Sequence, residues 1–266
     1  YDPADMDVAG FVEGEFDHMP PPHRMTRELN PDFSAFNVPH GAHGYHSHRA
    51  TDDRAWLQRL QAVYNGMVSF MDHTVGLILN KLDELGIADN TLVVYTTDHG
   101  DFLGQHGLHM KGAFHYEDLL RLPFLVRYPG HVPAGSTNHT LQGLVDLAPT
   151  FLAAGGIKVP GYMQGINQLP AWTQSADAGG RDHVLVENRH NNTVVHLRTY
   201  INQRYKMTLY RERPWGELFD LQEDPGELRN RFDDPAYAHI KAQLMQSWLQ
   251  AEIQREPTRF ARIAGA

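Results

Sequence analysis

A long amphipathic helix is the feature that most constrains how this chain folds. Apolar residues recur every three or four positions over Trp56–Leu85, which predicts a helix of about thirty residues with one buried stripe. Thr51 is the expected N-cap, and Gly86 is the expected C-terminal stop. We therefore expect Met67 and Met71, with the Trp and Tyr residues of the helix, to lie in the core.

Shorter elements follow this helix. The β-branched run over residues 90–97 predicts a central parallel strand that is buried on both faces. A second strand is expected at residues 123–128 and a helix at residues 144–155. Short strands parted by turns between residues 183 and 221, and an amphipathic helix at 236–253, predict an antiparallel sheet with one helix. The chain is thus predicted to be α/β first and α+β afterwards.

Three regions are expected from these changes in pattern. Residues 1–49 are rich in Pro, Gly, Asp and His and predict an irregular segment over the α/β domain. Residues 50–180 form the α/β part, and residues 181–266 form the antiparallel part. The first region holds a histidine cluster that lacks carboxylate or Cys companions, so a structural or specificity loop is favoured over a zinc site. Its members are His40, His43, His46 and His48.

Composition excludes several classes of function. The formal net charge of −9 argues against a nucleic-acid partner and against a basic membrane-binding surface. The chain has no Cys, which excludes disulfides, thiolate metal sites and cysteine nucleophiles within it. The sequence contains no apolar run long enough for a membrane span and no signal-peptide pattern, and its first residue is Tyr1. The cellular compartment is left open.

Candidate ligands follow the predicted strand directly. Ligands of open α/β sheets bind beyond the carboxyl ends of the strands, and here that position holds Asp98 and His99. A carboxylate beside an imidazole suits a divalent metal, and Gly100 allows a sharp turn. Lys111 closes the same loop, where its ammonium group could bind an anion next to that metal. The Asp-His-Gly triplet alone is a weak signal, because a strand-end aspartate is often only a turn cap.

Three more histidines and one more aspartate lie in or just after this loop. His106 and His109 are candidate substrate contacts, although we expect both to face solvent. His115 has two interpretations, one near the metal and one at the start of a short helix. Asp101 is either a partner of the metal ligands or a turn carboxylate.

The loop and its surroundings resemble the sulfatase family of the alkaline-phosphatase-like superfamily. Residues 98–112 follow the family's metal-binding segment, in which a strand leads to Asp, then Asn or His, Gly, a Leu-Gly-x-His-Gly stretch and a Lys. Matches run in order from about residue 60 to residue 230. They include Met71–Gly76, Leu85–Gly86, Asp89–Thr91, Arg121–Phe124, Val145–Thr150, Glu217–Leu221 and Asp224–Glu227.

The resemblance implies a fold and a chemistry. The fold is alkaline-phosphatase-like α/β, with a mixed or parallel sheet flanked by helices and a smaller C-terminal antiparallel α+β subdomain. Asp98 and His99 would bind one divalent metal, calcium first, with manganese or zinc as alternatives because a histidine ligand is less typical of calcium. Lys111 would contact the sulfate group and stabilise the leaving oxygen. The expected reaction is hydrolysis of a sulfate ester, either a small molecule or a sulfated glycan.

The nucleophile of such an enzyme is missing from this chain. The family uses a formylglycine made from the first residue of a Cys-x-Pro-x-Arg or Ser-x-Pro-x-Arg motif, and the sequence contains neither motif. Because that motif precedes the matched part in the family, we expect the N-terminal half of the fold to be a missing partner. This chain alone is then expected to be inactive and to expose core faces.

Two other functions are alternatives to a sulfatase. A phosphonate monoester or phosphodiester hydrolase of the superfamily would differ upstream, in its nucleophile. A non-catalytic binder of sulfated glycans would be expected to have lost the metal residues. Residues 1–49 and 160–200 are expected to recognise the leaving group, and the sequence is compatible with an oligomer.

Overall fold

The fold combines one long helix, a two-stranded sheet and a four-stranded sheet. The computed structural model describes residues 1–28, 53–173, 180–189 and 196–255. Its α-helices are α1 (Pro21–Met25), α3 (Arg54–Glu84), α4 (Glu117–Leu120), α5 (Leu147–Ala154), α6 (Leu169–Thr173) and α7 (Ala238–Gln254). Its strands are β1 (Val93–Tyr95), β2 (Leu125–Arg127), β3 (His183–Arg189), β4 (His196–Asn202), β5 (Tyr205–Tyr210) and β6 (Gly216–Asp220). Short 3-10 helices lie at Pro3–Asp5, Ala88–Asn90, Gln105–Gly107, Leu144–Asp146 and Pro235–Tyr237.

The long helix α3 forms as its periodicity predicts. Its N-cap is Asp53, whose Oδ1 accepts a hydrogen bond of 3.0 Å from the backbone N–H of Trp56. The predicted cap Thr51 lies outside the described residues. Gly86 follows the last turn with φ +68°, and its N–H donates to the carbonyl of Asp83. A glycine tolerates this left-handed conformation, so the predicted stop at Gly86 is confirmed.

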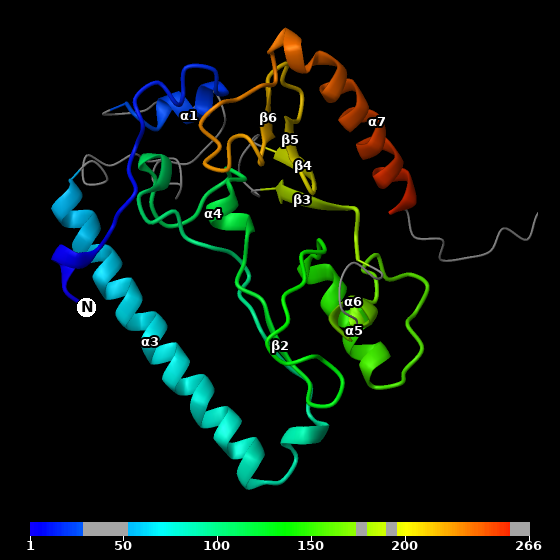
Figure 1. Ribbon diagram of the computed structural model, residues 1–266. Coiled ribbons are helices and arrows are strands. Elements are labelled where there is room, and N and C mark those ends of the chain that lie inside the picture. Colours follow the sequence, from blue (N-terminus) through cyan, green and yellow to red (C-terminus); the bar gives the residue numbers. More distant parts are fainter. Residues whose placement is uncertain (29–52, 174–179, 190–195, 256–266) are drawn as a thin grey trace, which may run out of the picture.

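The apolar stripe of α3 is not buried by the described part of the chain. Met67 is 54% exposed and Met71 is 48% exposed, so the prediction that they lie in the core is wrong here. Trp56 and Tyr64 are half-buried. In Figure 1, α3 runs along one side of the molecule, apart from both sheets, down to the 3-10 helix Ala88–Asn90 at its lower end. This outcome confirms the expectation that the chain exposes core faces, which also include Val63, Phe70, Leu77 and Ile78.

The first sheet differs from its prediction in direction and burial. β1 pairs antiparallel with β2, with Tyr95 opposite Leu125, and the residues of β1 are half-buried. The pairing is antiparallel because the loop that leaves the end of β1 returns the chain to that same end. The expected parallel neighbour and the expected burial on both faces are therefore absent from the described residues. A two-stranded sheet is marginal alone, and within the described part of the chain no strand pairs with the second edge of β1.

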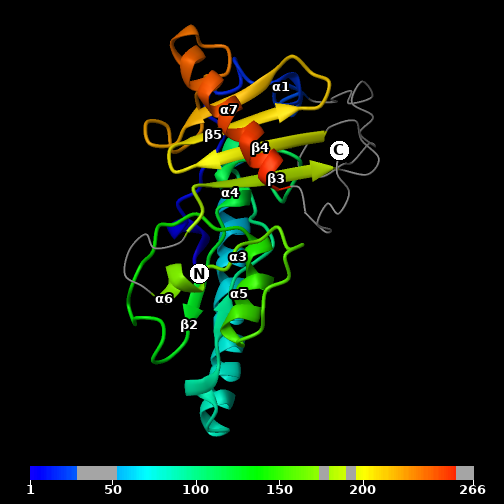
Figure 2. The same cartoon turned by 90° about the vertical axis from the view of Figure 1, so that its right-hand side faces the viewer.

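The antiparallel sheet and the helix predicted for the C-terminal part of the chain are both present. Strands β3, β4, β5 and β6 form one antiparallel sheet in sequence order. The helix α7 lies across this sheet, as Figure 2 shows from the side. The expected helix over residues 144–155 appears as a 3-10 turn followed by α5. The division of the chain into domains at residues 49/50 and 180/181 stays a prediction.

The two faces of the four-stranded sheet bury two separate cores. On one face Tyr200, Met207 and Leu218 pack against Leu244 and Trp248 of α7. Alternate residues on the other face meet the N-terminal segment and the loop that follows β1, because side chains alternate along a strand. This second core contains Phe16, Met19, Phe102, Leu108, Ala113, Phe114, Tyr116, Leu119, Leu197, Tyr210 and Phe219. The sheet thus serves as the platform on which the loop 98–117 rests.

The beginning of the chain is poor in helix, as predicted, over the residues that are described. Only Pro3–Asp5 and Pro21–Met25 form helical turns there. The histidine cluster of residues 40–48 lies outside the described residues. None of the described helices combines the length and the apolar character needed to cross a membrane.

Candidate metal and anion site

The structure brings the three predicted site residues together at the end of β1. The Nζ atom of Lys111 lies 3.0 Å from Nε2 of His99. That same Nε2 atom lies 3.8 Å from Oδ2 of Asp98. A carboxylate, an imidazole and an ammonium group therefore face one another, although Lys111 lies twelve residues further along the chain than His99.

The turn between Asp98 and the loop depends on the absence of a side chain at Gly100. A Cβ atom at this position would lie 1.8 Å from the carbonyl oxygen of Asp118, at the first turns of α4. The backbone N–H of Gly100 donates a 3.0 Å hydrogen bond to the carbonyl of Leu119. The loop after β1 is thus held directly against α4. His99 immediately precedes Gly100, so this contact fixes the backbone next to it.

The loop itself is closed by hydrogen bonds between its two arms. The N–H of Phe102 donates to the carbonyl of Met110 (3.0 Å), and the N–H of Gly104 donates to the carbonyl of Leu108 (2.8 Å). Asp101 adds to this closure, because its Oδ1 accepts from the N–H groups of Leu103 and Met110. Asp101 is therefore a turn carboxylate, which is one of its two predicted interpretations. Lys111 follows Met110 directly and so returns to His99.

The two candidate metal-binding side chains are open to solvent, and the carboxylate of Asp98 is ionised. The side chain of Asp98 is 81% exposed and that of His99 is 40% exposed. A hydrogen bond from its own backbone N–H, and then the nearby His99, hold the pKa of Asp98 below its ordinary value. The carboxylate is thus ionised at neutral pH. Further hydrogen bonds reach its Oδ1 from the N–H of His99 (3.1 Å) and the hydroxyl of Thr97 (3.3 Å), leaving Oδ2 toward the imidazole.

This donor set fits a divalent cation. Nδ1 of His99 lies 2.8 Å from the carbonyl oxygen of Gly100 and donates to it, which in the neutral ring leaves the lone pair on Nε2. Metal-binding histidines commonly fix their tautomer in this way. The ammonium of Lys111 lies 3.0 Å from that nitrogen, which is the position that a bound cation would take over from it. In the described parts of the chain, no group of three or more His, Cys, Asp or Glu side chains could hold a metal. Asp98 and His99 could therefore supply only part of a ligand set.

The two candidate substrate histidines have different surroundings. His106 is 3% exposed, with Nδ1 at 2.5 Å from Oε2 of Glu15, so the expectation that it faces solvent is wrong. Its ring stacks on Tyr116 at a centroid distance of 3.8 Å. His109 is half-buried, and its ring meets the edge of Trp56. The ring of His106 is enclosed by Glu15 and Tyr116, so His106 is not part of the substrate-binding proposal below.

Buried charges on the sheet hold the far end of the loop. Lys206 of β5 is 1% exposed and pairs with Glu227 and, at 3.1 Å, with Glu117 at the start of α4. Glu227 also accepts a 2.7 Å hydrogen bond from the N–H of Glu117. His115 is buried, and its Nδ1 lies 2.7 Å from the hydroxyl of Thr199. His115 therefore belongs to the contact with the sheet, which decides between its two interpretations in favour of the helix start.

His115 predicts a specific dependence of stability on pH. Burial, and then the charge of Lys206, lower its pKa from 6.5 to about 3. Below pH 6.5 this histidine therefore binds a proton in the unfolded chain but stays neutral in the folded chain. The stability that the neutral, buried His115 contributes is fully present above pH 6.5. It is lost as the pH falls toward 3, by about 1.4 kcal/mol of unfolding free energy per pH unit.

The variant His115→Gln keeps a hydrogen-bonding group without this titration. Its free energy of unfolding, measured by denaturant titration between about pH 4 and pH 6, should fall less steeply with acidification than that of the parent. Equal slopes for the two proteins would contradict a neutral His115 in the folded state.

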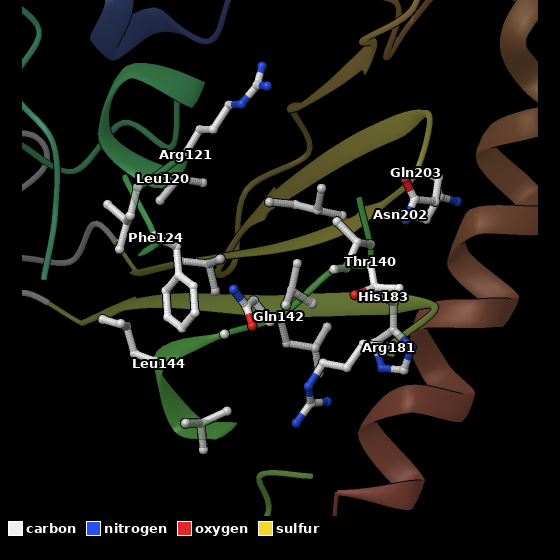
Figure 3. Close-up of a pocket in the computed structure, with 18 of the residues that line it drawn as sticks. Leu120, Arg121, Phe124, Thr140, Gln142, Leu144, Arg181, His183, Asn202 and Gln203 are labelled. Carbon is white, nitrogen blue, oxygen red and sulfur yellow. The ribbon is translucent and has the colours of Figure 1, made fainter. Parts of the chain in front are cut away.

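A cavity of about 980 Å³ opens beside Asp98, between the two sheets. Figure 3 shows apolar side chains, among them Phe124 and Leu144, on one side of it and polar groups such as His183 and Asn202 on the other. Part of the lining comes from residues 160–200, where the sequence predicts recognition of the leaving group. Arg181 is held there by Asp146, whose two oxygens accept hydrogen bonds from its guanidinium at 2.5 and 2.7 Å.

Comparison with known families decides what this site belongs to. The family described as Sulfatase matches residues 23–157, and the family described as N-sulphoglucosamine sulphohydrolase, C-terminal, matches residues 104–254. The chain belongs to the sulfatase family. The two matches overlap across the loop that carries Lys111, so the family assignment covers the site as well as the sheet behind it.

Several curated sulfatases are similar to this chain. The N-acetylglucosamine-6-O-sulfatase of Bacteroides thetaiotaomicron is 34% identical over 212 residues, which cover 75% of this chain and 36% of that protein. The arylsulfatase of Clostridium perfringens is 29% identical over 184 residues, covering 68% of this chain and 37% of that protein. This sulfatase chain thus spans little more than a third of the length of these relatives.

Solved structures confirm the alkaline-phosphatase-like fold. A protein in complex with its substrate D-glucosamine-2-N,6-O-disulfate matches with a TM-score of 0.71 and 31% identity, covering 78% of this chain and 44% of that one. The phosphonate monoester hydrolase of Silicibacter pomeroyi matches with a TM-score of 0.80 and 24% identity, covering 99% and 54%. At 24% identity, the match to this hydrolase shows only that the two proteins share a fold.

Proposed function

We propose that this chain supplies the metal- and anion-binding part of a sulfuric ester hydrolase. The observation that carries the proposal is the convergence of Asp98, His99 and Lys111 at the end of β1, in a chain of the sulfatase family. Their geometry provides two metal-ligand atoms and one cation on the same side of the loop. A non-catalytic glycan binder would not need this combination to be retained.

Each of the three side chains has a defined task in this proposal. Oδ2 of Asp98 and Nε2 of His99 bind one divalent cation, and we propose calcium, with manganese or zinc as the alternatives that a histidine ligand would also suit. Such a cation supplies Lewis-acid polarisation of the sulfate oxygens. The ammonium of Lys111 binds the same oxygens and stabilises negative charge on the oxygen that leaves.

We propose that the nucleophile and the remaining ligands come from an N-terminal half of the same fold. The chain has no Cys, and the matched relatives are more than twice as long as the part that aligns. The exposed stripe of α3, and the edge of β1 with which no described strand pairs, support a partner that adds strands and covers the helix. A formylglycine in that half would provide the nucleophile. The complete enzyme, below, means this chain together with that half.

The substrate class in this proposal is a sulfate ester of a sugar or of a sulfated glycan. The relatives include an N-acetylglucosamine-6-O-sulfatase and a protein with a bound disulfated glucosamine, which supports a sulfated sugar. The cavity next to Asp98 has apolar and hydrogen-bonding sides, which suits the body of a sugar ring. A small aryl sulfate would serve as a general test substrate.

Replacing Lys111 tests the role of its ammonium group. In the complete enzyme, Lys111→Ala should lower kcat/KM for an aryl sulfate by about 10²–10³-fold, because one charge-stabilising group is lost. Metal content should stay unchanged, since Lys111 is not a ligand. Lys158→Ala, on the connection after α5, is a matched control that should leave kcat/KM at the parent value. If Lys111→Ala hydrolysed the aryl sulfate at the parent rate, the role assigned to Lys111 would be wrong.

A phosphonate monoester hydrolase is the second candidate. It is favoured by a structural match to the phosphonate monoester hydrolase of Agrobacterium radiobacter, at 26% identity and a TM-score of 0.70 over 77% of this chain and 43% of that one. A 28% identity to the multifunctional alkaline phosphatase superfamily protein PehA of Trinickia caryophylli also supports it. The ratio of kcat/KM for an aryl sulfate to that for the matching aryl phosphonate monoester separates the two. A ratio above one supports the sulfatase, and a ratio well below one supports the second candidate.

A further inference from the structure

The N-terminal segment Val8–Arg27 packs around residues 104–107, which form the tip of the loop 98–117 that carries the site. Gly104 faces it so closely that a Cβ atom there would lie 3.0 Å from the carbonyl oxygen of Ala9. A Cβ atom on Gly107 would lie 2.5 Å from Nη1 of Arg27. In Figure 1 the blue N-terminal segment runs beside the green loop that precedes α4. The tip of the loop is therefore enclosed by a segment about ninety residues earlier in the sequence.

A buried pair of a carboxyl group and an imidazole lies at the centre of this contact. Oε2 of Glu15 is 2.5 Å from Nδ1 of His106, and the side chains are 1% and 3% exposed. The second oxygen of Glu15 accepts a 2.7 Å hydrogen bond from the N–H of Val12, which fixes the carboxylate within its own turn. Such a pair resists separation, because removing either partner leaves the other one buried without compensation.

The side chain of His106 holds its own backbone in an unusual conformation. His106 has φ +56°, a left-handed conformation that is uncommon in residues other than glycine. Its ring stacks on Tyr116, and Nε2 lies 3.9 Å from Oδ2 of Asp118. The ring is thus held by Glu15 and Tyr116, with the carboxylate of Asp118 close to its other nitrogen. A strained residue persists where its surroundings determine it in this way.

From His106 the constraint reaches the site along two routes. Asp118 is the residue whose carbonyl oxygen packs against Gly100, directly after His99. The hydrogen bonds of Phe102 and Gly104 tie the two arms of the loop together below its tip. Moving the tip would therefore shift the arm that leads to Lys111 relative to His99.

We propose that Glu15 and His106 are positioning residues of the metal and anion site. Their pair sets the register between the two arms of the loop, so that the ammonium of Lys111 and the imidazole of His99 keep facing the same point of the site. The proposal rests on the proposed function where it concerns catalysis. Its structural part, that the pair fixes the loop, does not depend on the reaction.

The test compares Glu15→Gln with the parent in the complete enzyme. Glutamine keeps the shape and one hydrogen bond but removes the charge. We expect kcat for an aryl sulfate to fall by about 10–100-fold with little change in KM, because groups that orient the acting residues have effects of this size. The amides of Phe102 and Gly104 should exchange with deuterium faster, while the amides of β5 keep their protection. Glu15→Asp, which keeps the charge, should recover part of kcat.

Asp220→Asn is the matched control. Asp220 is also buried, at 2% exposure, and pairs with Arg204 on the four-stranded sheet. It should lower the melting temperature and leave kcat unchanged. The proposal is overturned if Glu15→Gln lowers the melting temperature but the folded enzyme keeps the parent kcat, or if the loop amides exchange at the parent rate. If the parent hydrolyses no sulfate ester, the proposed function fails, and amide exchange alone decides whether the pair fixes the loop.

Discussion

Asp98→Ala is expected to reduce sulfate-ester hydrolysis by the complete enzyme by about 10³-fold or more. Asp98 contributes an ionised carboxylate next to Nε2 of His99, and loss of Lewis-acid help is worth several kcal/mol in the rate of such reactions. The side chain is 81% exposed, so the variant should fold as the parent does. Measuring kcat and melting temperature together separates a loss of chemistry from a loss of structure.

Asp89 provides a control at the opposite end of β1. It is exposed in the 3-10 helix that precedes the strand, and Asp89→Ala should keep the parent kcat. If Asp98→Ala hydrolysed an aryl sulfate at the parent rate, Asp98 would not belong to the site. A large loss in Asp89→Ala would show that the assay responds to general damage.

Gly100→Ala is the second change with a large expected effect. The added Cβ atom would lie 1.8 Å from the carbonyl oxygen of Asp118, which is backbone and cannot rotate away. The turn after β1 or the start of α4 must then shift, at a cost of about 3 kcal/mol in the free energy of unfolding. Since Gly100 adjoins His99, metal affinity should weaken together with stability. Denaturant titration and metal titration would follow the two effects.

Gly76→Ala is the natural comparison, because a Cβ atom on Gly76 meets nothing within 4 Å. Gly76 lies inside α3, where alanine is the better helix former, so this change should stabilise the helix by about 0.5–1 kcal/mol. If Gly100→Ala were as harmless as Gly76→Ala, the close packing of the loop on α4 would be wrong.

Local pattern was sufficient to predict most elements and the composition of the site. The three-and-four spacing predicted α3, and alternation with turn residues predicted the four-stranded sheet. The site loop was predictable because its ligand candidates sit directly after a strand and its lysine closes the same loop. Nearness of Lys111 to His99 is a consequence of loop closure over a short stretch of sequence.

Features that depend on distant partners were not predictable. An apolar stripe shows that α3 has a face to bury, but whether Met67 is covered depends on what packs there. Periodicity also does not specify whether β2 returns beside β1 in the antiparallel direction. His106 looks like a solvent-facing loop residue until Glu15, 91 positions earlier, is placed against it. Lys206 is similar, since its partner carboxylates lie on other elements.

Elemental analysis of the purified complete enzyme tests directly whether Asp98 and His99 bind a metal. We expect one divalent metal ion per chain, calcium, which is lost from Asp98→Ala and retained by Lys111→Ala at the parent level. Sulfate release should be lost in the same Asp98 variant. Two zinc ions per chain, or a metal content that does not respond to Asp98→Ala while aryl sulfate hydrolysis continues, would contradict the assignment of this site.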